Sequence, residues 1–195
     1  MWHKDYQTQI QSIIKYSKLC YDRNMVSAAG GNVSCRCDRG IIITGSNKSL
    51  GSIDTQSLLL CDGEDGHVIS ANKGQKPSKE LLFHMNVYKC RKSVNCVIHV
   101  HPTFATAYTY YQKFLPLFTV SAQLKLKEVP LIAAAAPGSN ELAQNISKAV
   151  ALYSDTSSFL LEKHGILTMG STMEQCFNLA ELIEETAKIA VLLKL

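Results

Sequence analysis

Two histidines separated by one residue interrupt an apolar stretch in the middle of the chain. His99 and His101 lie in CVIHVHPTFATA, residues 96–107. Alternate side chains of a β-strand point to the same face, so these two imidazoles would lie side by side. Pro102 cannot continue a ladder of strand hydrogen bonds, and it would end the strand directly after them. Such a pair can share a metal ion or form a hydrogen-bonded structural pair, and its spacing leaves both interpretations open.

A third histidine and one carboxylate extend the possible chemistry. His164 lies in FLLEKHGILT, residues 159–168, at the break between two apolar segments. Three neutral imidazoles commonly hold a catalytic zinc ion and leave one position for water or substrate. Taken alone, His164 fits an exposed turn residue better. Glu80 in GQKPSKELLFH, residues 74–84, falls in the first turn of a predicted helix, where it could transfer a proton or only complement the helix dipole.

Several short polar segments could bind an anion. Ser78, Lys79 and the free backbone N–H groups of the helix that follows could hold a phosphate, although Ser78 could also serve only as a helix cap. The glycine-rich segments GGNVS at 30–34 and TGSNKSLG at 44–51 could form anion-binding turns. His84 follows Glu80 by one helical turn, which is compatible with a metal ligand and favours a packed histidine.

Composition limits the class of protein. The chain has 195 residues, of which 46% are hydrophobic and 18% charged, so we expect one globular domain over residues 1–195. The net charge of +4 is spread along the chain and suits small anionic substrates better than nucleic acid. No apolar run approaches the roughly 18 residues of a membrane span. The first residues, MWHKDYQTQIQS, contain no apolar signal core.

The cysteines indicate a reducing compartment. Seven is an odd number, and the residues are scattered, so a cytoplasmic protein is expected rather than a disulfide scaffold. Cys35 and Cys37 form one Cys-x-Cys pair without a second pair, which is a weak metal motif and fits two free thiols.

The elements that must position these residues follow from hydrophobic periodicity. We predict helices over 5–23, from 78 to about 90, from about 103, over 139–152 and from 173 to the C-terminus. Hairpins are predicted at 33–44 and 58–69, a strand at 94–99, and two strands on either side of 163–165. The segment from the end of the third helix to residue 131 has no clear pattern. These elements favour one largely antiparallel sheet covered by helices, an α/β fold.

The ordered set of motifs resembles the class II aldolase/adducin family. The set consists of GGNVS at 30–34, ITGSNKSLG at 43–51, KPSKE at 76–80, HVH at 99–101 and KHG at 163–165. The resemblance covers nearly the whole chain. It implies a three-layer αβα fold with a central, mainly antiparallel sheet. It also implies a homotetramer with active sites between subunits.

The resemblance also implies roles for individual residues. His99, His101 and His164 match the zinc ligands of the family, with one Zn²⁺ expected per subunit. Glu80 matches the acid/base carboxylate, which can also contact the metal. The remaining matches are to positions that hold the substrate phosphate: Asn32, Ser46, Asn47, Ser78 and Lys79.

The implied activity is that of a zinc-dependent carbon–carbon lyase. Its substrate would be a phosphorylated short-chain sugar or sugar acid, cleaved through a metal-stabilised enediolate. The stretches QKPSKELLFHMNVY, SLGSID and ELIEETAKIAVLL are most similar to the 3-oxo-tetronate 4-phosphate decarboxylases. The next comparison is with the L-fuculose-phosphate aldolases, which cleave a ketose 1-phosphate. The alternatives are an epimerase or dehydratase acting on a phosphopentulose, and a non-catalytic, adducin-like interaction module.

Two departures from the family pattern concern the substrate. Family members often carry a tyrosine roughly twenty residues after the second histidine, and this chain has LPLFTVSAQLK there, with Ser121 as the nearest hydroxyl. Lys79 replaces a serine of the aldolases, and it could contact a phosphate, contact a carboxylate or stay in solvent.

Overall fold

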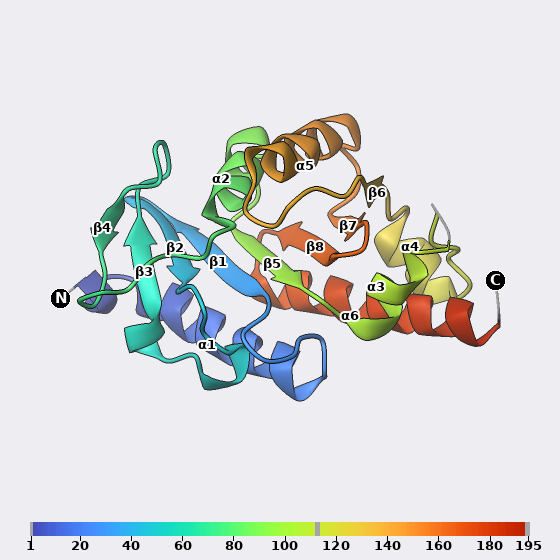
Figure 1. Ribbon diagram of the computed structural model, residues 1–195, viewed down its shortest axis with the longest axis horizontal. Coiled ribbons are helices and arrows are strands. Elements are labelled where there is room, and N and C mark those ends of the chain that lie inside the picture. The colour runs from blue at the N-terminus through green and yellow to red at the C-terminus, as the bar shows by residue number, and fades with distance from the viewer. Residues whose placement is uncertain (1, 112–113, 194–195) are drawn as a thin grey trace.

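The chain folds around a single mixed sheet of eight strands. The computed structural model describes residues 2–111 and 114–193. The strands are β1 (Asn32–Cys37), β2 (Gly40–Thr44), β3 (Leu58–Cys61), β4 (Val68–Ser70), β5 (Cys96–Val100), β6 (Leu131–Ile132), β7 (Ser158–Leu161) and β8 (Gly165–Gly170). Their order across the sheet is β4-β3-β2-β1-β5-β8-β7-β6 (Figure 1). Among the strand pairs of the described residues, only β6–β7 is parallel, which confirms the prediction of a mainly antiparallel sheet.

Helices cover both faces of the sheet and complete three layers. On one face, α2 (Leu81–Cys90) packs against α5 (Asn140–Leu152). On the other face lie α1 (Gln7–Asp22), α3 (Thr103–Tyr108), α4 (Val120–Leu126) and the long α6 (Met173–Leu192), which contacts the other three (Figure 1). Three short 3-10 helices, at Trp2–Lys4, Leu50–Ser52 and Thr55–Ser57, precede α1 and join β2 to β3.

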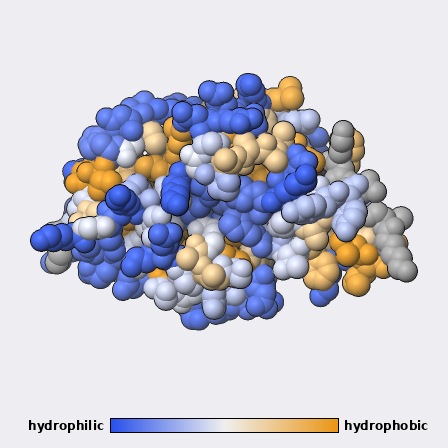
Figure 2. Space-filling model, in the orientation of Figure 1, coloured by the Kyte–Doolittle hydropathy of each residue, from blue (hydrophilic) through white to orange (hydrophobic). Residues whose placement is uncertain are grey.

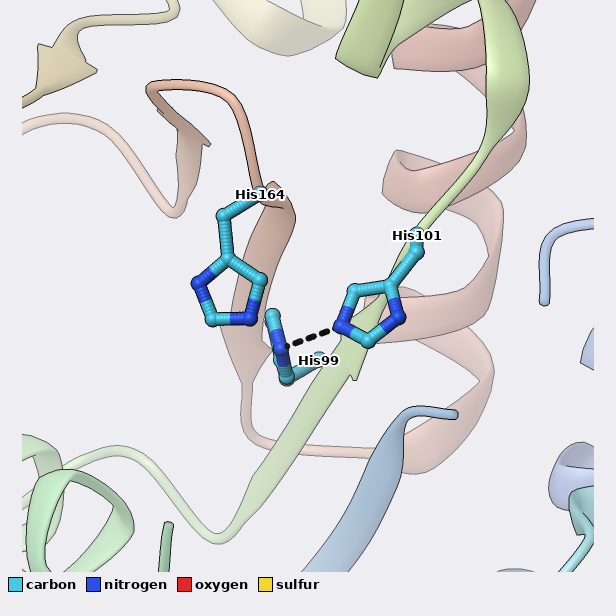
Figure 3. Close-up of side chains that lie close together, drawn as sticks. All are labelled: His99, His101 and His164. Carbon is cyan, nitrogen blue, oxygen red and sulfur yellow. Dashed lines mark hydrogen bonds between the residues drawn. The ribbon is translucent and has the colours of Figure 1, made fainter. Parts of the chain in front are cut away.

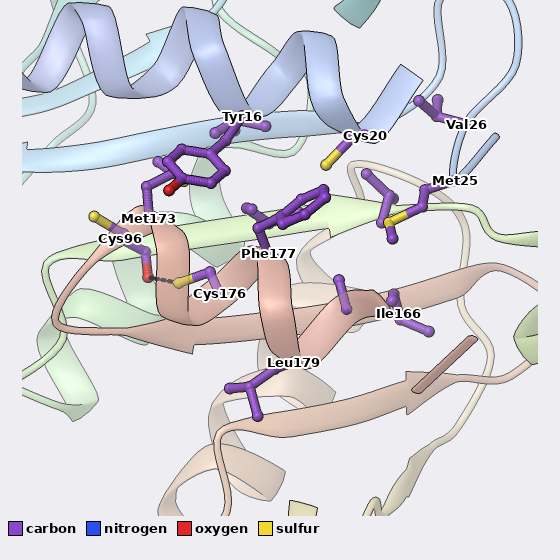
Figure 4. Close-up of a cluster of buried hydrophobic side chains, with 14 of the residues drawn as sticks. Tyr16, Cys20, Met25, Val26, Cys96, Ile166, Met173, Cys176, Phe177 and Leu179 are labelled. Carbon is purple, nitrogen blue, oxygen red and sulfur yellow. Dashed lines mark hydrogen bonds between the residues drawn. The ribbon is translucent and has the colours of Figure 1, made fainter. Parts of the chain in front are cut away.

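Alternation along the strands divides the core into two parts. In β5, Ile98 joins the buried cluster under α1 and α6, and Val97 joins the cluster under α2 and α5. The first cluster includes the inner face of α6, where Phe177 packs against Tyr16 of α1 and the thiol of Cys176 donates to the carbonyl of Cys96 (Figure 4). His99 is two residues after Val97, so the strand directs its ring into the layer of α2.

The predicted hairpins and helices are present, with two differences. The second helix begins at Leu81 rather than at Ser78, because Ser78 closes a turn in which its carbonyl accepts from the Leu81 N–H. The unpatterned segment before residue 131 contains α4, which was not predicted. Two of its apolar side chains, Val120 and Leu124, are each 71% exposed, so the helix lacks the amphipathic pattern on which sequence prediction depends.

Within the described residues, no helix is both long and apolar enough for a membrane crossing.

Candidate metal centre

Three histidine side chains converge at one end of the central strands. His99 and His101 come from the end of β5, and His164 comes from the turn between β7 and β8 (Figure 3). The Nε2 atoms of His99 and His101 are 2.9 Å apart. The three residues each offer a ring nitrogen, and these atoms all lie within 4.8 Å of one another. The structure therefore brings together all three histidines that the sequence analysis singled out.

The tautomer of His99 leaves its inner nitrogen free for a ligand. Its Nδ1 donates to the carbonyl oxygen of Ile166 on β8, at 2.9 Å. In the neutral ring, the lone pair then lies on Nε2, the atom that faces the other two histidines. A backbone carbonyl that fixes a ring in this way is typical of metal-binding histidines.

Burial keeps the three rings neutral. Burial lowers the pKa of His99 well below its usual range, and the nearby His101 and His164 lower it further. Burial, then the proximity of His164, lowers the pKa of His101. Burial also lowers the pKa of His164, while Glu80 acts in the opposite direction. Neutral imidazole is the form that binds a metal ion, so no proton has to be removed at neutral pH.

Neighbouring segments hold the two loops that carry His101 and His164. Glu184 of α6 accepts hydrogen bonds from the backbone N–H groups of Phe104 and Ala105, in the first turn of the helix that follows His101. Lys163 has a φ of 55° at the β7–β8 turn, and its N–H donates to the Thr109 hydroxyl at 2.8 Å. Neither support was predicted from the sequence, because nothing local marks a contact between residues 54 to 80 positions apart.

Two glycines allow the backbone to approach the ring of His101. A Cβ atom at Gly165 would lie 2.3 Å from the carbonyl oxygen of Val100 and 2.8 Å from Cδ2 of His101. A Cβ atom at Gly30 would lie 2.9 Å from Nδ1 of the same ring. Both distances to the ring are shorter than real Cβ contacts, so the ring occupies space that only glycine leaves open.

Glu80 faces the histidine cluster from the start of α2. Its Oε2 lies 3.3 Å from Nε2 of His99, and its Oε1 lies 3.5 Å from Nε2 of His164. The carboxylate is buried, with 7% of the residue exposed, and Oε1 has no hydrogen-bond partner among the described residues. A buried, unpaired carboxylate oxygen is costly, so this atom is suited to a ligand that completes its bonding.

The residues expected at a substrate phosphate lie on two adjoining loops beside Glu80. A bridge pairs Gly45 with Pro77, and the Ser46 N–H donates to the carbonyl of Lys76. The bridge is antiparallel, so Ser46 lies opposite Lys76 and Ser78 lies opposite Thr44, whose carbonyl accepts from the Ser78 N–H. Asn47, next along the first loop, has a positive φ of 58°. Asn32 differs, because it is buried and its amide bonds to Glu80 and His84. Phosphate contact by these five residues stays a prediction.

The other candidates of the sequence analysis lie outside the cluster. His84 is a fully buried, hydrogen-bonded residue, as its place on α2 favoured. Cys35 and Cys37 take no part in any ligand cluster found within residues 2–111 and 114–193, and both are free thiols. Ser121 lies exposed on α4.

The donor set fits a divalent transition metal ion. Three neutral nitrogen atoms meet at one point, and an unpaired carboxylate oxygen lies beside them. Imidazole suits zinc and its first-row neighbours, whereas Mg²⁺ and Ca²⁺ prefer sites made of oxygen ligands. The residues would hold the ion through the three histidines and leave the remaining position open.

Comparisons with a family model, with curated proteins and with solved structures all find similarity to class II aldolases and their relatives. Residues 11–191 match the model of the Class II Aldolase and Adducin N-terminal domain. An L-fuculose phosphate aldolase of Methanococcus maripaludis is 34% identical, with 92% of this chain and 94% of that protein covered. A 3-oxo-tetronate 4-phosphate decarboxylase of Escherichia coli is 30% identical, with 96% and 88% covered. The crystal structure of YgbL from Escherichia coli superimposes with a TM-score of 0.86 at 28% identity, over 96% of this chain and 90% of that one.

Proposed function

The chain belongs to the class II aldolase and adducin family and is a lyase of the aldolase or decarboxylase type, and we propose that it uses zinc to cleave a phosphorylated short-chain sugar or sugar acid. The observation that carries the proposal is the convergence of His99, His101 and His164 on one point, with the free oxygen of Glu80 beside it. A non-catalytic, adducin-like module would have no use for a buried site of this kind.

The proposed chemistry divides the work between the metal and the chain. A bound Zn²⁺ would act as a Lewis acid on the substrate carbonyl and stabilise the enediolate that forms when the carbon–carbon bond breaks. The three histidines would hold that ion. Glu80, through Oε1, would accept the proton released in aldol cleavage and return it to the carbon that becomes a methylene group. Burial of Glu80 excludes bulk water from this transfer.

The phosphate of the substrate would bind beside α2. Within the described part of the chain, the hydroxyl of Ser78 accepts a bond from the Glu80 N–H and donates none, so it could donate to a phosphate, as could the hydroxyl of Ser46. Lys79 is exposed and adds a positive charge, and the N-terminus of α2 adds a partial positive charge. Asn47 stands at the turn of the same loop. A phosphate bound at this position would orient the reacting carbons toward Glu80 and the metal. Asn32 would act through its hydrogen bond to the Glu80 carboxylate.

An assay of product formation would identify the substrate. The zinc-loaded protein is mixed separately with 3-oxo-tetronate 4-phosphate and with a panel of ketose 1-phosphates, including L-fuculose 1-phosphate. Decarboxylation of the first and aldol cleavage of the second both release dihydroxyacetone phosphate, which one coupled enzyme detects. Turnover of the oxo acid identifies a decarboxylase, and turnover of a ketose phosphate identifies an aldolase. No product from either class, with zinc bound, would contradict the proposal and favour epimerisation or dehydration of a phosphopentulose.

We also propose that the chain works in the cytoplasm as a homotetramer whose active sites lie between subunits. Apolar side chains gather on an exposed surface near α4, at the right-hand end of the molecule (Figure 2). Tyr111 is 83% exposed and Phe114 is 81% exposed. Apolar patches of this kind commonly mark protein–protein contacts. Light scattering tests the assembly, and a monomer at micromolar concentration would contradict it.

A further inference from the structure

A continuous chain of hydrogen bonds runs behind the Glu80 carboxylate. Oε2 of Glu80 accepts from Nδ2 of Asn32 at 2.8 Å. Oδ1 of the same amide lies 2.5 Å from Nε2 of His84, and Nδ1 of His84 lies 2.7 Å from the hydroxyl of Ser34. The hydroxyl of Tyr88 lies 2.8 Å from that of Ser34. All five residues are buried.

The residues of this hydrogen-bond chain come from two elements, α2 and β1, and the repeat of each element places them in line. Glu80, His84 and Tyr88 are four residues apart, so they form a stripe along one side of α2. Asn32 and Ser34 are two residues apart on β1, so they point to the same face of the sheet. The two stripes alternate where α2 crosses the strand. Asn32 also pairs directly with His99 in the β1–β5 register, which connects the chain to the metal centre.

The chemistry of the side chains determines the donor and the acceptor of each hydrogen bond between Glu80 and Ser34. Asn32 must donate from Nδ2, because a carboxylate only accepts, so its Oδ1 must accept from His84. His84 therefore carries its proton on Nε2, and its Nδ1 accepts from the hydroxyl of Ser34. Ser34 then has a lone pair for the hydroxyl of Tyr88. Apart from Oε1 of Glu80, the polar side-chain atoms named here all have hydrogen-bond partners, as a buried polar network requires.

We propose that His84 is a positioning residue which, through Asn32, fixes the amide orientation that holds the Glu80 carboxylate against the metal centre. The inference rests on the function proposed above, in which Glu80 is the acid/base group that His84 would help to orient. A flipped Asn32 amide would present an oxygen to the carboxylate, and the two acceptors would repel. His84 prevents the flip, because only Oδ1 can accept its Nε2 proton. Oε2 is therefore held, and Oε1 remains free for proton transfer.

The state of His84 suits a fixed structural donor. Burial lowers the pKa of His84 to about 3, with a further lowering from nearby His99. The ring is thus neutral across the working pH range and keeps a single donor. Phe83 stacks on it, with the ring centroids 4.7 Å apart, which restrains the orientation of the imidazole.

Two substitutions separate the hydrogen bond from the packing. His84→Gln keeps an N–H donor near the position of Nε2, whereas His84→Phe keeps a flat ring and loses the donor. Both are measured at equal zinc content, with His67→Gln and His67→Phe on an exposed loop as matched controls. We expect His84→Phe to lower kcat by about 10- to 100-fold with KM changed less than about 3-fold, as for other groups that orient a ligand from behind. His84→Gln should recover most of kcat.

A spectroscopic measurement on the unchanged protein tests the same inference without turnover. Long-range ¹H–¹⁵N correlation of the histidine rings identifies which nitrogen of His84 carries the proton. The hydrogen-bond chain from Glu80 to Tyr88, here called the relay, requires that His84 has a protonated Nε2 and an unprotonated Nδ1 at pH 7. The opposite tautomer would overturn the inference, as would wild-type kcat in zinc-loaded His84→Phe. If no sugar phosphate is turned over, the proposed function fails, and the tautomer still decides whether the relay exists.

Discussion

At the scale of single residues, the site divides one buried space between two kinds of group. Three imidazoles kept neutral by burial supply lone pairs, and one carboxylate supplies an oxygen with no other partner. Neutral ligands leave most of the charge of a divalent ion uncompensated, which strengthens its effect on a bound carbonyl. In the proposed mechanism, the carboxylate of Glu80 would act beside these ligands, where the proton is transferred.

Replacement of a metal ligand should remove the metal and the activity together. In His99→Ala, the protein loses the ring that Ile166 orients, and two histidines remain. We expect bound zinc to fall from one equivalent per subunit to below about one tenth of an equivalent after dialysis, because tight binding needs all three histidine ligands. Elemental analysis and the product assay measure the two effects, with His3→Ala as the control. A variant that is active without zinc would refute the assignment of the site.

Removal of the charge of Glu80 should separate chemistry from metal binding. Glu80→Gln keeps the shape of the side chain and loses the base, so kcat should fall by about 10²- to 10⁴-fold. The three histidines remain, so we expect zinc content to stay at one equivalent. Glu64→Gln, at an exposed carboxylate paired with Lys89, serves as the control. Unchanged kcat in Glu80→Gln would show that another group transfers the proton.

At the scale of elements, the site lies where strand ends and turns meet. The β5–β8 pairing brings His99 and His101 near the β7–β8 turn of His164, and α2 begins beside the same edge. Each element needs an anchor outside itself. Glu184 of α6 supplies one at the start of α3, and Thr109 at the end of α3 supplies another for the turn at Lys163.

Gly165→Ala should damage the site through the backbone. The new methyl group would lie 2.3 Å from the Val100 carbonyl and 2.8 Å from the ring of His101, so β5 and β8 would have to separate. Overpacking of this kind costs about 1–3 kcal/mol of unfolding free energy, and displacement of His101 should weaken zinc binding. Urea unfolding and zinc titration measure both quantities. Gly63→Ala is the control, since its methyl group would meet nothing closer than 3.6 Å, and equal stability of the two variants would contradict this account.

The cap supplied by Glu184 should contribute to stability in a measurable way. Glu184→Ala leaves the N–H groups of Phe104 and Ala105 without their acceptor at the start of α3. Loss of a helix cap typically lowers the free energy of unfolding by about 0.5–2 kcal/mol. Urea unfolding measures the loss, and Glu185→Ala on the exposed side of the same helix should change little. Equal effects of the two substitutions would argue that Glu184 acts only through the propensity of α6.

At the scale of the whole molecule, burial of neutral histidines links folding to pH. The pKa of His84 is lowered to about 3 in the folded chain, whereas an unfolded histidine titrates near 6.5. Below pH 6.5, the unfolded chain therefore binds a proton that the folded chain excludes. The stabilising contribution is complete above pH 6.5 and is lost as the pH falls from 6.5 toward 3.

Chemical unfolding of the metal-free protein measures this linkage. Each such histidine should lower the free energy of unfolding by up to about 1.4 kcal/mol per pH unit within the window. In His84→Gln, the slope between pH 6 and pH 4 should be smaller than in the unchanged protein by that amount. Identical slopes in the two proteins would show that His84 is protonated in the folded state.

Local patterns in the sequence predicted most of the elements. The hairpins of β1–β2 and β3–β4, the buried strand β5 and the helices α1, α5 and α6 follow from hydrophobic periodicity and turn residues. Helix α4 was missed, because its exposed apolar side chains hide the helical repeat. The start of α2 was misplaced by three residues, because Ser78 closes a turn instead of beginning the helix.

The sequence by itself determined which groups are available for chemistry: three histidines with strand and turn spacing, and a carboxylate at a helix start. Only the tertiary structure decided that they meet, and that Asn32 bonds both to Glu80, 48 residues away in the sequence, and to His84, 52 residues away. The physical reason is that periodicity assigns a side chain to a face of its own element. Its partners depend on the order of strands in the sheet and on the packing of α2 over β1, which no local pattern records.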